Sequence, residues 1–137
     1  MSQASVYEFF KAPNACELLG VKDDKEAVLA SHVLSFLGKK PYVLPDLRAR
    51  EGDDLLSFQE ELVELLGTLH AFYHEPSSKK ILIAPLRTLL TPLPSKKVFQ
   101  SYVLSFGDRL NLSSFKEQMF HWGYQAVDVV QGKGEIS

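Results

Sequence analysis

The run Lys80-Ile81-Leu82-Ile83-Ala84-Pro85 decides the fold class of this chain. Every residue from Ile81 to Pro85 is apolar, so the run lacks the alternation of polar and apolar residues that a strand with one solvated face shows. A run of this length and composition predicts a strand buried on both faces of a mostly parallel sheet. Because helices must cover both faces of such a sheet, the surrounding sequence is expected to supply them.

Two strands and two helices are expected before this run, and they alternate along the chain. Residues 15–21 form an apolar stretch of strand length, and residues 42–44 form a brief strand between prolines, which cannot donate to a ladder. The helices are expected at residues 24–37 and 58–73. This alternation predicts a layered α/β fold.

Each of the two helices carries a start signal and an apolar stripe. The first begins where Asp23 precedes Glu26 by three residues, which has the form of a capping box, and Gly38 occupies the position of a left-handed C-terminal cap. The second begins where Ser57 precedes Glu60 with the same spacing. The apolar stripes, at positions that face the core in an amphipathic helix, are Leu29, Val33, Phe36 and Leu37 in the first helix and Phe58, Leu62, Leu65, Leu69 and Phe72 in the second.

The first domain is expected to comprise residues 1–100, and residues 101–137 are expected to start a small α+β domain. In this second part, residues 102–106 and 126–130 are predicted strands, and a helix ends at Gly123. The face of that helix consists of Leu112, Phe115, Met119 and Trp122. The chain stops just after the turn at Gly132-Lys133-Gly134, so we expect it to be a piece of a longer protein.

The composition is that of a soluble globular protein that can bury a core. Of 137 residues, 45% are hydrophobic and 23% are charged, which excludes wholesale disorder. The 15 basic and 17 acidic residues give no global positive field that would draw the chain onto DNA or an anionic membrane. A single cysteine and the lack of an export signal or membrane-spanning stretch predict a reducing, cytoplasmic setting.

No phosphate-binding loop is present in the sequence. Such a loop needs glycines spaced around a lysine and a hydroxyl residue, so that backbone N–H groups can hold the phosphates. The nearest stretch, Leu19-Gly20-Val21-Lys22, lacks the second glycine and the hydroxyl partner. We therefore expect this chain neither to bind nor to hydrolyse ATP, and to hold no cofactor.

Two other groups of residues and a single cysteine could carry chemistry, although simpler interpretations are favoured. His70 and His74 have a spacing that could present two imidazoles to a metal ion, but no neighbour completes the ligand shell, so packing or solvent-side histidines are expected. Cys16 is expected to be a small buried hydrophobe. The acidic residues before the second helix lack the ligand order of a calcium loop and are expected to form a solvated loop: Asp46, Glu51, Asp53 and Asp54.

Four motifs in the second half resemble the N-terminal region of bacterial transcription-repair coupling factor (Mfd). In order, they are Lys80-Ile-Leu-Ile-Ala-Pro-Leu-Arg-Thr-Leu-Leu-Thr-Pro-Leu-Pro94, Gly107-Asp108-Arg109-Leu110, Gly123-Tyr124-Gln125-Ala126-Val127-Asp128-Val129-Val130 and Gly134-Glu135. The match runs from about Leu44 to the end of the chain. It includes Leu44-Pro45-Asp46 and Gly52-Asp53-Asp54, where the family has a proline-and-aspartate loop before a long helix.

The resemblance implies that residues 1–100 form a RecA-like three-layer domain without nucleotide-binding motifs, similar to the first lobe of UvrB. It implies that residues 101–137 begin the domain that docks onto UvrA in the family, and Gly134 and Glu135 are the candidate partner-binding residues. No catalytic or metal-ligating residue is implied. The family's motor, which uses ATP and magnesium, and its modules for RNA polymerase and DNA lie downstream of this sequence.

The leading hypothesis is therefore a non-catalytic N-terminal fragment of a coupling factor, whose parent displaces stalled RNA polymerase at DNA lesions and recruits the UvrA excision-repair machinery. Two alternatives come from other classes. One is a small stand-alone metal-dependent enzyme using His70 and His74, which a metal titration would reveal. The other is an α/β protein-interaction domain unrelated to repair, which a reading frame many times longer than this chain would exclude.

Overall fold

A computed structural model of the chain describes residues 2–12, 16–50, 52–132 and 134–137. It divides the chain into two compact units, of which the first ends at Ser101 and the second begins at Tyr102. Each unit contains a small sheet of its own. Within the described residues, no helix is long and apolar enough to cross a membrane.

The sheet of the first unit consists of three parallel strands, β1 (Leu18–Val21), β2 (Lys40–Val43) and β3 (Lys80–Pro85). The strand order is β1-β3-β2, with Gly20 beside Ala84 on one side of β3 and Tyr42 beside Leu82 on the other. Residues 81–85 are all buried, which confirms the prediction of a strand covered on both faces. The predicted α/β class is confirmed in the form of a mixed fold with a small parallel sheet.

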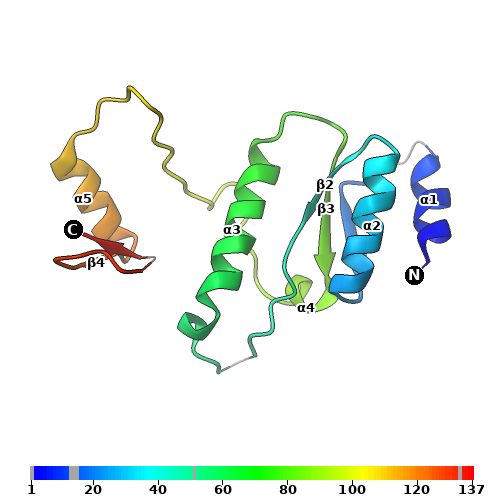
Figure 1. The fold of residues 1–137 in the computed structure, drawn as a ribbon, viewed down its shortest axis with the longest axis horizontal. Coiled ribbons are helices and arrows are strands. Elements are labelled where there is room, and N and C mark those ends of the chain that lie inside the picture. The colour runs from blue at the N-terminus through cyan, green and yellow to red at the C-terminus, as the bar shows by residue number, and fades with distance from the viewer. Residues whose placement is uncertain (1, 13–15, 51, 133) are drawn as a thin grey trace. The chain divides into compact units, whose positions relative to one another are not determined.

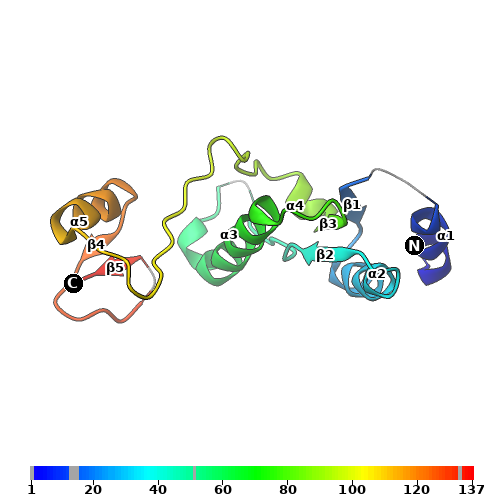
Figure 2. The same ribbon diagram turned by 90° about the horizontal axis from the view of Figure 1, so that it is seen from above.

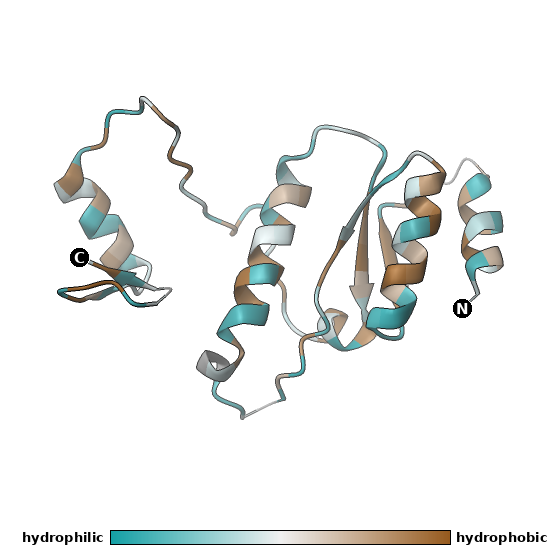
Figure 3. Cartoon of the chain, in the orientation of Figure 1, coloured by the Kyte–Doolittle hydropathy of each residue, from teal (hydrophilic) through white to brown (hydrophobic). Residues whose placement is uncertain are grey.

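Two helices cover opposite faces of this sheet. α2 (Asp24–Phe36) leads from β1 past β3 to β2, and α3 (Gln59–His74) leads back from β2 to β3. Because the two connections cross the sheet in opposite directions and such crossovers are right-handed, their helices lie on opposite faces, as Figures 1 and 2 show. Figure 3 shows the apolar strand β3 between these two helices.

Each face of the sheet has a hydrophobic core of its own. α1 (Gln3–Lys11) packs against α2 and contributes to the first core, into which the odd-numbered residues of β3 point. The buried residues of the first core are Val6, Phe10, Val21, Ala27, Ala30, Leu34, Ile81 and Ile83. Those of the second core, under α3, are Leu44, Leu65, Leu69, Phe72, Leu82 and Ala84.

The buried face of α2 differs from the predicted stripe. Ala27, Ala30 and Leu34 are buried, whereas Leu29 is 41% exposed and Phe36 is 81% exposed. The other two members of the predicted stripe are partly buried against the first core. Small alanines let the helix approach α1 and the sheet closely, but they contribute little to a periodicity that is dominated by large side chains.

Both predicted ends of α2 are confirmed. Oδ1 of Asp23 accepts a hydrogen bond from the backbone N–H of Glu26 at 3.1 Å, and the helix begins at the next residue. At the other end Gly38 adopts a φ of 74°, and the N–H of Lys39 donates to the carbonyl of Leu34 at 2.9 Å. This bond pattern and the left-handed glycine form the C-terminal cap that the sequence predicts.

The capping box predicted for α3 is not formed. A 3-10 turn, η1 (Leu55–Phe58), leads directly into the helix, whose N-cap residue makes no side-chain cap bond. Ser57 lies inside this turn and its N–H donates to the carbonyl of Asp54 at 3.1 Å, so it is not at the helix boundary, where a capping serine belongs. The predicted apolar stripe of α3 is nevertheless correct in its last three members, which lie in the second core.

A short helix, α4 (Leu86–Leu89), stabilises the loop that follows β2 through hydrogen bonds. Thr88 is fully buried, its hydroxyl donates to the carbonyl of Pro45 at 2.6 Å, and it accepts from the N–H of Leu47 at 2.9 Å. Leu44 and Leu47 of that loop are also buried. One hydroxyl group therefore satisfies two backbone groups of a buried loop.

The second unit contains one helix of the predicted extent, α5 (Leu112–His121). Its start is fixed by Asn111, whose side chain accepts from the N–H of Ser114 at 3.1 Å, and its end by Gly123, where the cap was predicted. Of the predicted face, Met119 is buried and Leu112 is 60% exposed.

The strands of the second unit are shorter than predicted. β4 (Gln125–Ala126) and β5 (Glu135–Ile136) form a two-stranded parallel pair. The predicted strand at residues 126–130 is thus wrong beyond Ala126, and the predicted strand at residues 102–106 has no regular structure. Alternating residues do not make a strand without a neighbouring strand to bond, and within the described residues of this unit β4 and β5 pair only with each other.

Candidate functional site

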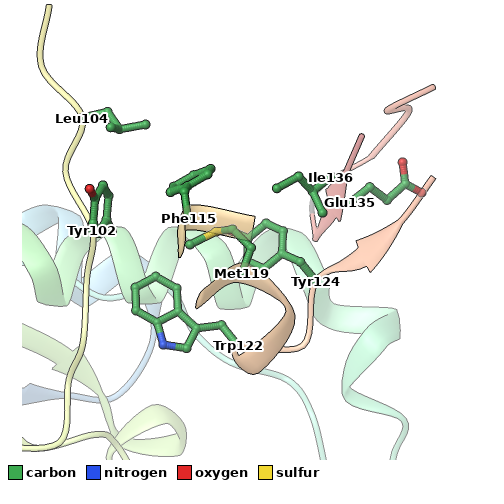
Figure 4. A pocket seen from close by; sticks show the side chains of 8 residues that line it. All are labelled: Tyr102, Leu104, Phe115, Met119, Trp122, Tyr124, Glu135 and Ile136. Carbon is green, nitrogen blue, oxygen red and sulfur yellow. The ribbon is translucent and has the colours of Figure 1, made fainter. Parts of the chain in front are cut away.

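The second unit contains an apolar pocket with a volume of about 310 Å³. Tyr102 and Phe115 meet edge to face in its wall, with ring centroids 5.5 Å apart and an interplanar angle of 61°. Figure 4 shows that side chains from the segment before α5, from α5 and from β5 surround the same space. The lining residues are Tyr102, Leu104, Phe115, Met119, Trp122, Tyr124, Glu135 and Ile136.

Of the two predicted partner-binding residues, Glu135 lines this pocket, and Gly134 directly precedes the strand β5, which begins at Glu135. Oε2 of Glu135 accepts hydrogen bonds from the backbone N–H groups of Gln131 at 2.7 Å and Gly132 at 2.9 Å. These two bonds hold the pKa of the Glu135 carboxyl below its usual range. Gly134 has a φ of 86° and its carbonyl accepts from the N–H of Gln125 at 2.9 Å. Their contact with a partner stays a prediction.

The carboxyl end of β1 is the place where a phosphate-binding loop would lie in an α/β domain. Here only Lys22 and the N-cap residue Asp23 separate β1 from α2. The N–H of Lys22 donates to Oε2 of Glu26 at 2.8 Å, and the N–H of Glu26 donates to Asp23. Carboxylates of the chain itself therefore occupy N–H groups that would otherwise face an anion.

A second cavity, with a volume of about 480 Å³, lies at the carboxyl end of β2. Its charged lining consists of Arg48 and four acidic residues, Asp24, Asp46, Glu61 and Glu64. The Nε of Arg87 lies 3.9 Å from Oδ1 of Asp46, which is buried and makes no hydrogen bond to any described residue. This excess of negative charge disfavours a nucleotide phosphate at this end of the sheet.

His70 and His74 lie side by side on α3. Their rings stack with centroids 4.2 Å apart, and Nδ1 of His74 lies 2.9 Å from the carbonyl oxygen of His70. Nε2 of His70 is buried without a hydrogen-bond partner in the described part of the chain, beside the ring of Phe99. No group of three or more potential ligand side chains occurs among the described residues.

The acidic loop and the cysteine have local roles. Oδ2 of Asp53 accepts from the N–H of Arg50 at 2.8 Å and closes a turn, whereas Asp46 lies next to Arg87. Glu51 lies outside the described residues. Cys16 packs against the first core but is only partly buried, whereas full burial was predicted, and its thiol lies 2.8 Å from the carbonyl oxygen of Leu18.

The pocket of the second unit is not predicted from the sequence. Its signal was the density of large aromatic residues between Tyr102 and Tyr124, together with the predicted helix face of Phe115, Met119 and Trp122. Periodicity identified that face as the side of a helix that packs. It did not show that the face would border an open pocket, because the positions of the segments on either side of α5 depend on tertiary structure.

Two curated relatives match the chain, both named Transcription-repair-coupling factor, from Helicobacter pylori strains J99 / ATCC 700824 and ATCC 700392 / 26695. Each is 38% identical to it over 141 residues, and the match covers 100% of this chain and 14% of the relative. The chain thus spans about one seventh of the length of these relatives. No family model matches the chain, and no solved structure matches it.

This match corrects one expectation, since the similarity does not begin at about Leu44 but includes the residues before it. β1 and α2, the first β-α pair of the first sheet, therefore lie within the matched region. The resemblance of the chain to the N-terminal region of transcription-repair coupling factor is confirmed, and it extends over the whole chain.

Proposed function

We propose that this chain is the non-catalytic N-terminal part of a transcription-repair coupling factor and serves it as a protein-docking region in the cytoplasm. The observation that carries the proposal is the similarity of all 137 residues to one end of a much longer factor. In this proposal the first unit is a RecA-like domain that has lost its nucleotide site. The second unit starts the domain that recruits UvrA, and the parent displaces stalled RNA polymerase from DNA with a downstream motor that uses ATP and magnesium.

The geometry at the carboxyl ends of the strands supports the non-catalytic part of the proposal. The N–H of Lys22 and the first turn of α2 are bonded to the side chains of Glu26 and Asp23. The nearby cavity is lined by four carboxylates and one guanidinium group. A triphosphate would have to break these bonds and approach like charges, and both requirements disfavour binding.

We therefore expect the isolated chain to show no binding of Mg-ATP in isothermal titration calorimetry up to millimolar nucleotide. The matched control is the full-length factor, which should bind ATP through its downstream motor under the same conditions. A micromolar affinity of the isolated chain would contradict the proposal. Competition of that binding by ADP would then establish that the chain holds a genuine nucleotide site.

The docking part of the proposal is supported by the apolar surface of the second unit. Among its described residues Met119 is the only buried side chain, and large apolar residues such as Val103, Leu112 and Val129 are more than half exposed. A unit with so small a core gains further order when it forms an interface, beyond the turn and strand pair that it has alone, at a cost of about 1–2 kcal/mol for each backbone residue that becomes fixed. The pocket described above is therefore expected to bind well only when further chain completes the domain.

This expectation gives a direct test with UvrA. The 137-residue chain should retain UvrA weakly in a pull-down, and a chain extended through the whole second domain should retain at least tenfold more, because its interface is ordered before binding. A chain ending at Ser101 serves as the matched control and should retain none. Equal retention by the 137-residue and the extended chain would show that the first unit holds the binding surface.

A further inference from the structure

The connection between β4 and β5 is short for a parallel pair. The pairing joins Gln125 to Glu135 and Ala126 to Ile136, so residues 127–134 must carry the chain back to the start of a strand that runs in the same direction. Parallel neighbours usually need a crossover of about a dozen residues or more. Specific bonds must therefore hold this compact connection in place.

The side chain of Glu135 supplies two of these bonds. Both the N–H of Gln131 and the N–H of Gly132 donate to the same oxygen, Oε2, at 2.7 and 2.9 Å. Bonds to an ionised acceptor are stronger than those between neutral groups. They join residues 131 and 132, near the end of the connection, to the first residue of β5. The carboxylate thus holds the loop against the strand that follows it.

The backbone completes this closure. The carbonyl of Gly134 accepts from Gln125 at 2.9 Å and that of Ile136 accepts from Val127 at 2.9 Å, which places β5 against β4. Gly134 has a φ of 86°, which favours glycine over residues with a Cβ. The carboxylate of Glu135 also points away from the rings of Phe115 and Trp122 in Figure 4, so it borders the pocket without extending into it.

The resemblance implies that Glu135 binds the partner directly; we propose instead that it is a positioning residue of the docking domain. Its carboxylate closes the 131–132 turn, sets β5 in register beside β4, and does not itself contact the partner protein. The inference rests on the proposed function only in naming UvrA as that partner. In this proposal the charged carboxylate of Glu135 accepts hydrogen bonds from the backbone of its own loop. The residues that contact the partner are those that line the pocket and those that β5 holds in place.

The first experiment tests the turn without any partner. In a ¹H–¹⁵N NMR titration of the 137-residue chain from pH 7 to pH 2.5, the amide signals of Gln131 and Gly132 should shift together, with a midpoint below the usual range of a glutamate. The two backbone bonds stabilise the ionised carboxylate, so the pKa of Glu135 is lower in the folded than in the unfolded state. Both bonds are therefore fully present above the pKa of the unfolded chain, and they are lost as the pH falls through the lower pKa of the folded chain.

Two variants make this result specific. Glu135→Gln keeps an oxygen that can accept the two bonds, so the amide signals of Gln131 and Gly132 should stay near their wild-type positions at pH 7 and lose their pH dependence. Glu135→Ala should move both signals toward random-coil values. Glu117→Gln, on the exposed side of α5, is the matched control and should leave the titration unchanged. Amide signals at 131 and 132 that do not follow the titration of Glu135 would overturn the proposal.

The second experiment separates positioning from contact in the full-length factor. UvrA binding should fall at least tenfold in Glu135→Ala but by less than about threefold in Glu135→Gln, because the amide preserves the turn. A direct ion pair with the partner predicts instead that both variants lose the same affinity and the same salt dependence. Equal losses would overturn the positioning role of Glu135, even if the NMR titration shows that the turn is formed. If the wild-type factor fails to bind UvrA, that result contradicts only the proposed function.

Discussion

Replacement of Leu34 by alanine is expected to lower the free energy of unfolding by about 2–5 kcal/mol, the usual cost of truncating a large side chain in a packed core. Leu34 of α2 is fully buried in the first core, to which α1 and the odd-numbered residues of β3 also contribute. Its removal leaves a cavity that rigid neighbours on the sheet cannot fill. The change is measured by urea denaturation followed by far-ultraviolet circular dichroism.

Phe36, two residues further along the same helix, is the matched control. Its side chain is 81% exposed, so Phe36→Ala should change the free energy of unfolding by less than about 0.5 kcal/mol. The pair tests the orientation of α2, because the stripe predicted from the sequence contains Phe36 and not Leu34. A larger loss for Phe36→Ala than for Leu34→Ala would mean that the helix packs on the predicted stripe.

Replacement of Thr88 by valine is expected to cost about 2–4 kcal/mol of stability, although the two side chains have nearly the same shape. The valine removes the hydroxyl that donates to Pro45 and accepts from Leu47, and leaves both backbone groups without a partner at a buried site. Each unsatisfied buried group costs about 1–3 kcal/mol. The expected readout is a lower urea midpoint with an unchanged m-value.

Two neighbouring substitutions make the Thr88 result specific. Thr88→Ser retains the hydroxyl and should recover most of the stability lost in Thr88→Val. Thr91 donates to the carbonyl of Arg87 at 3.3 Å on the exposed side of the same segment, so Thr91→Val should be almost neutral. Equal effects of valine at the two positions would show that the buried hydroxyl does not hold the loop after β2.

The parts of the fold that depend on residues close together in the sequence could be predicted. Asp23 with Glu26, and Gly38 with the preceding turn, act within a few residues, so the ends of α2 could be predicted. The continuous apolar run of β3 indicates directly that this strand is buried on both faces. The match to the coupling factor likewise depends on contiguous motifs.

Features set by packing could not be predicted in the same way. The orientation of α2 depends on α1 and β3, whose side chains share the first core with its two buried alanines. Ser57 has the right spacing for a capping box, yet the chain enters α3 through a 3-10 turn that shifts the helix start beyond it. The partners of Thr88 are more than 40 residues away in the sequence, so no local pattern indicates its role.

The strand order of the first sheet also determines how that sheet can form during synthesis. β1 and β2 bond only to β3 within this sheet, and β3 is the last of the three in the chain. While the chain is being made from its N-terminus, α1 and α2 can meet early, but the sheet hydrogen bonds of β1 and β2 must wait until residues 80–85 leave the ribosome. The first unit therefore assembles in a late step that inserts its most buried strand between two segments of the chain that have already been made.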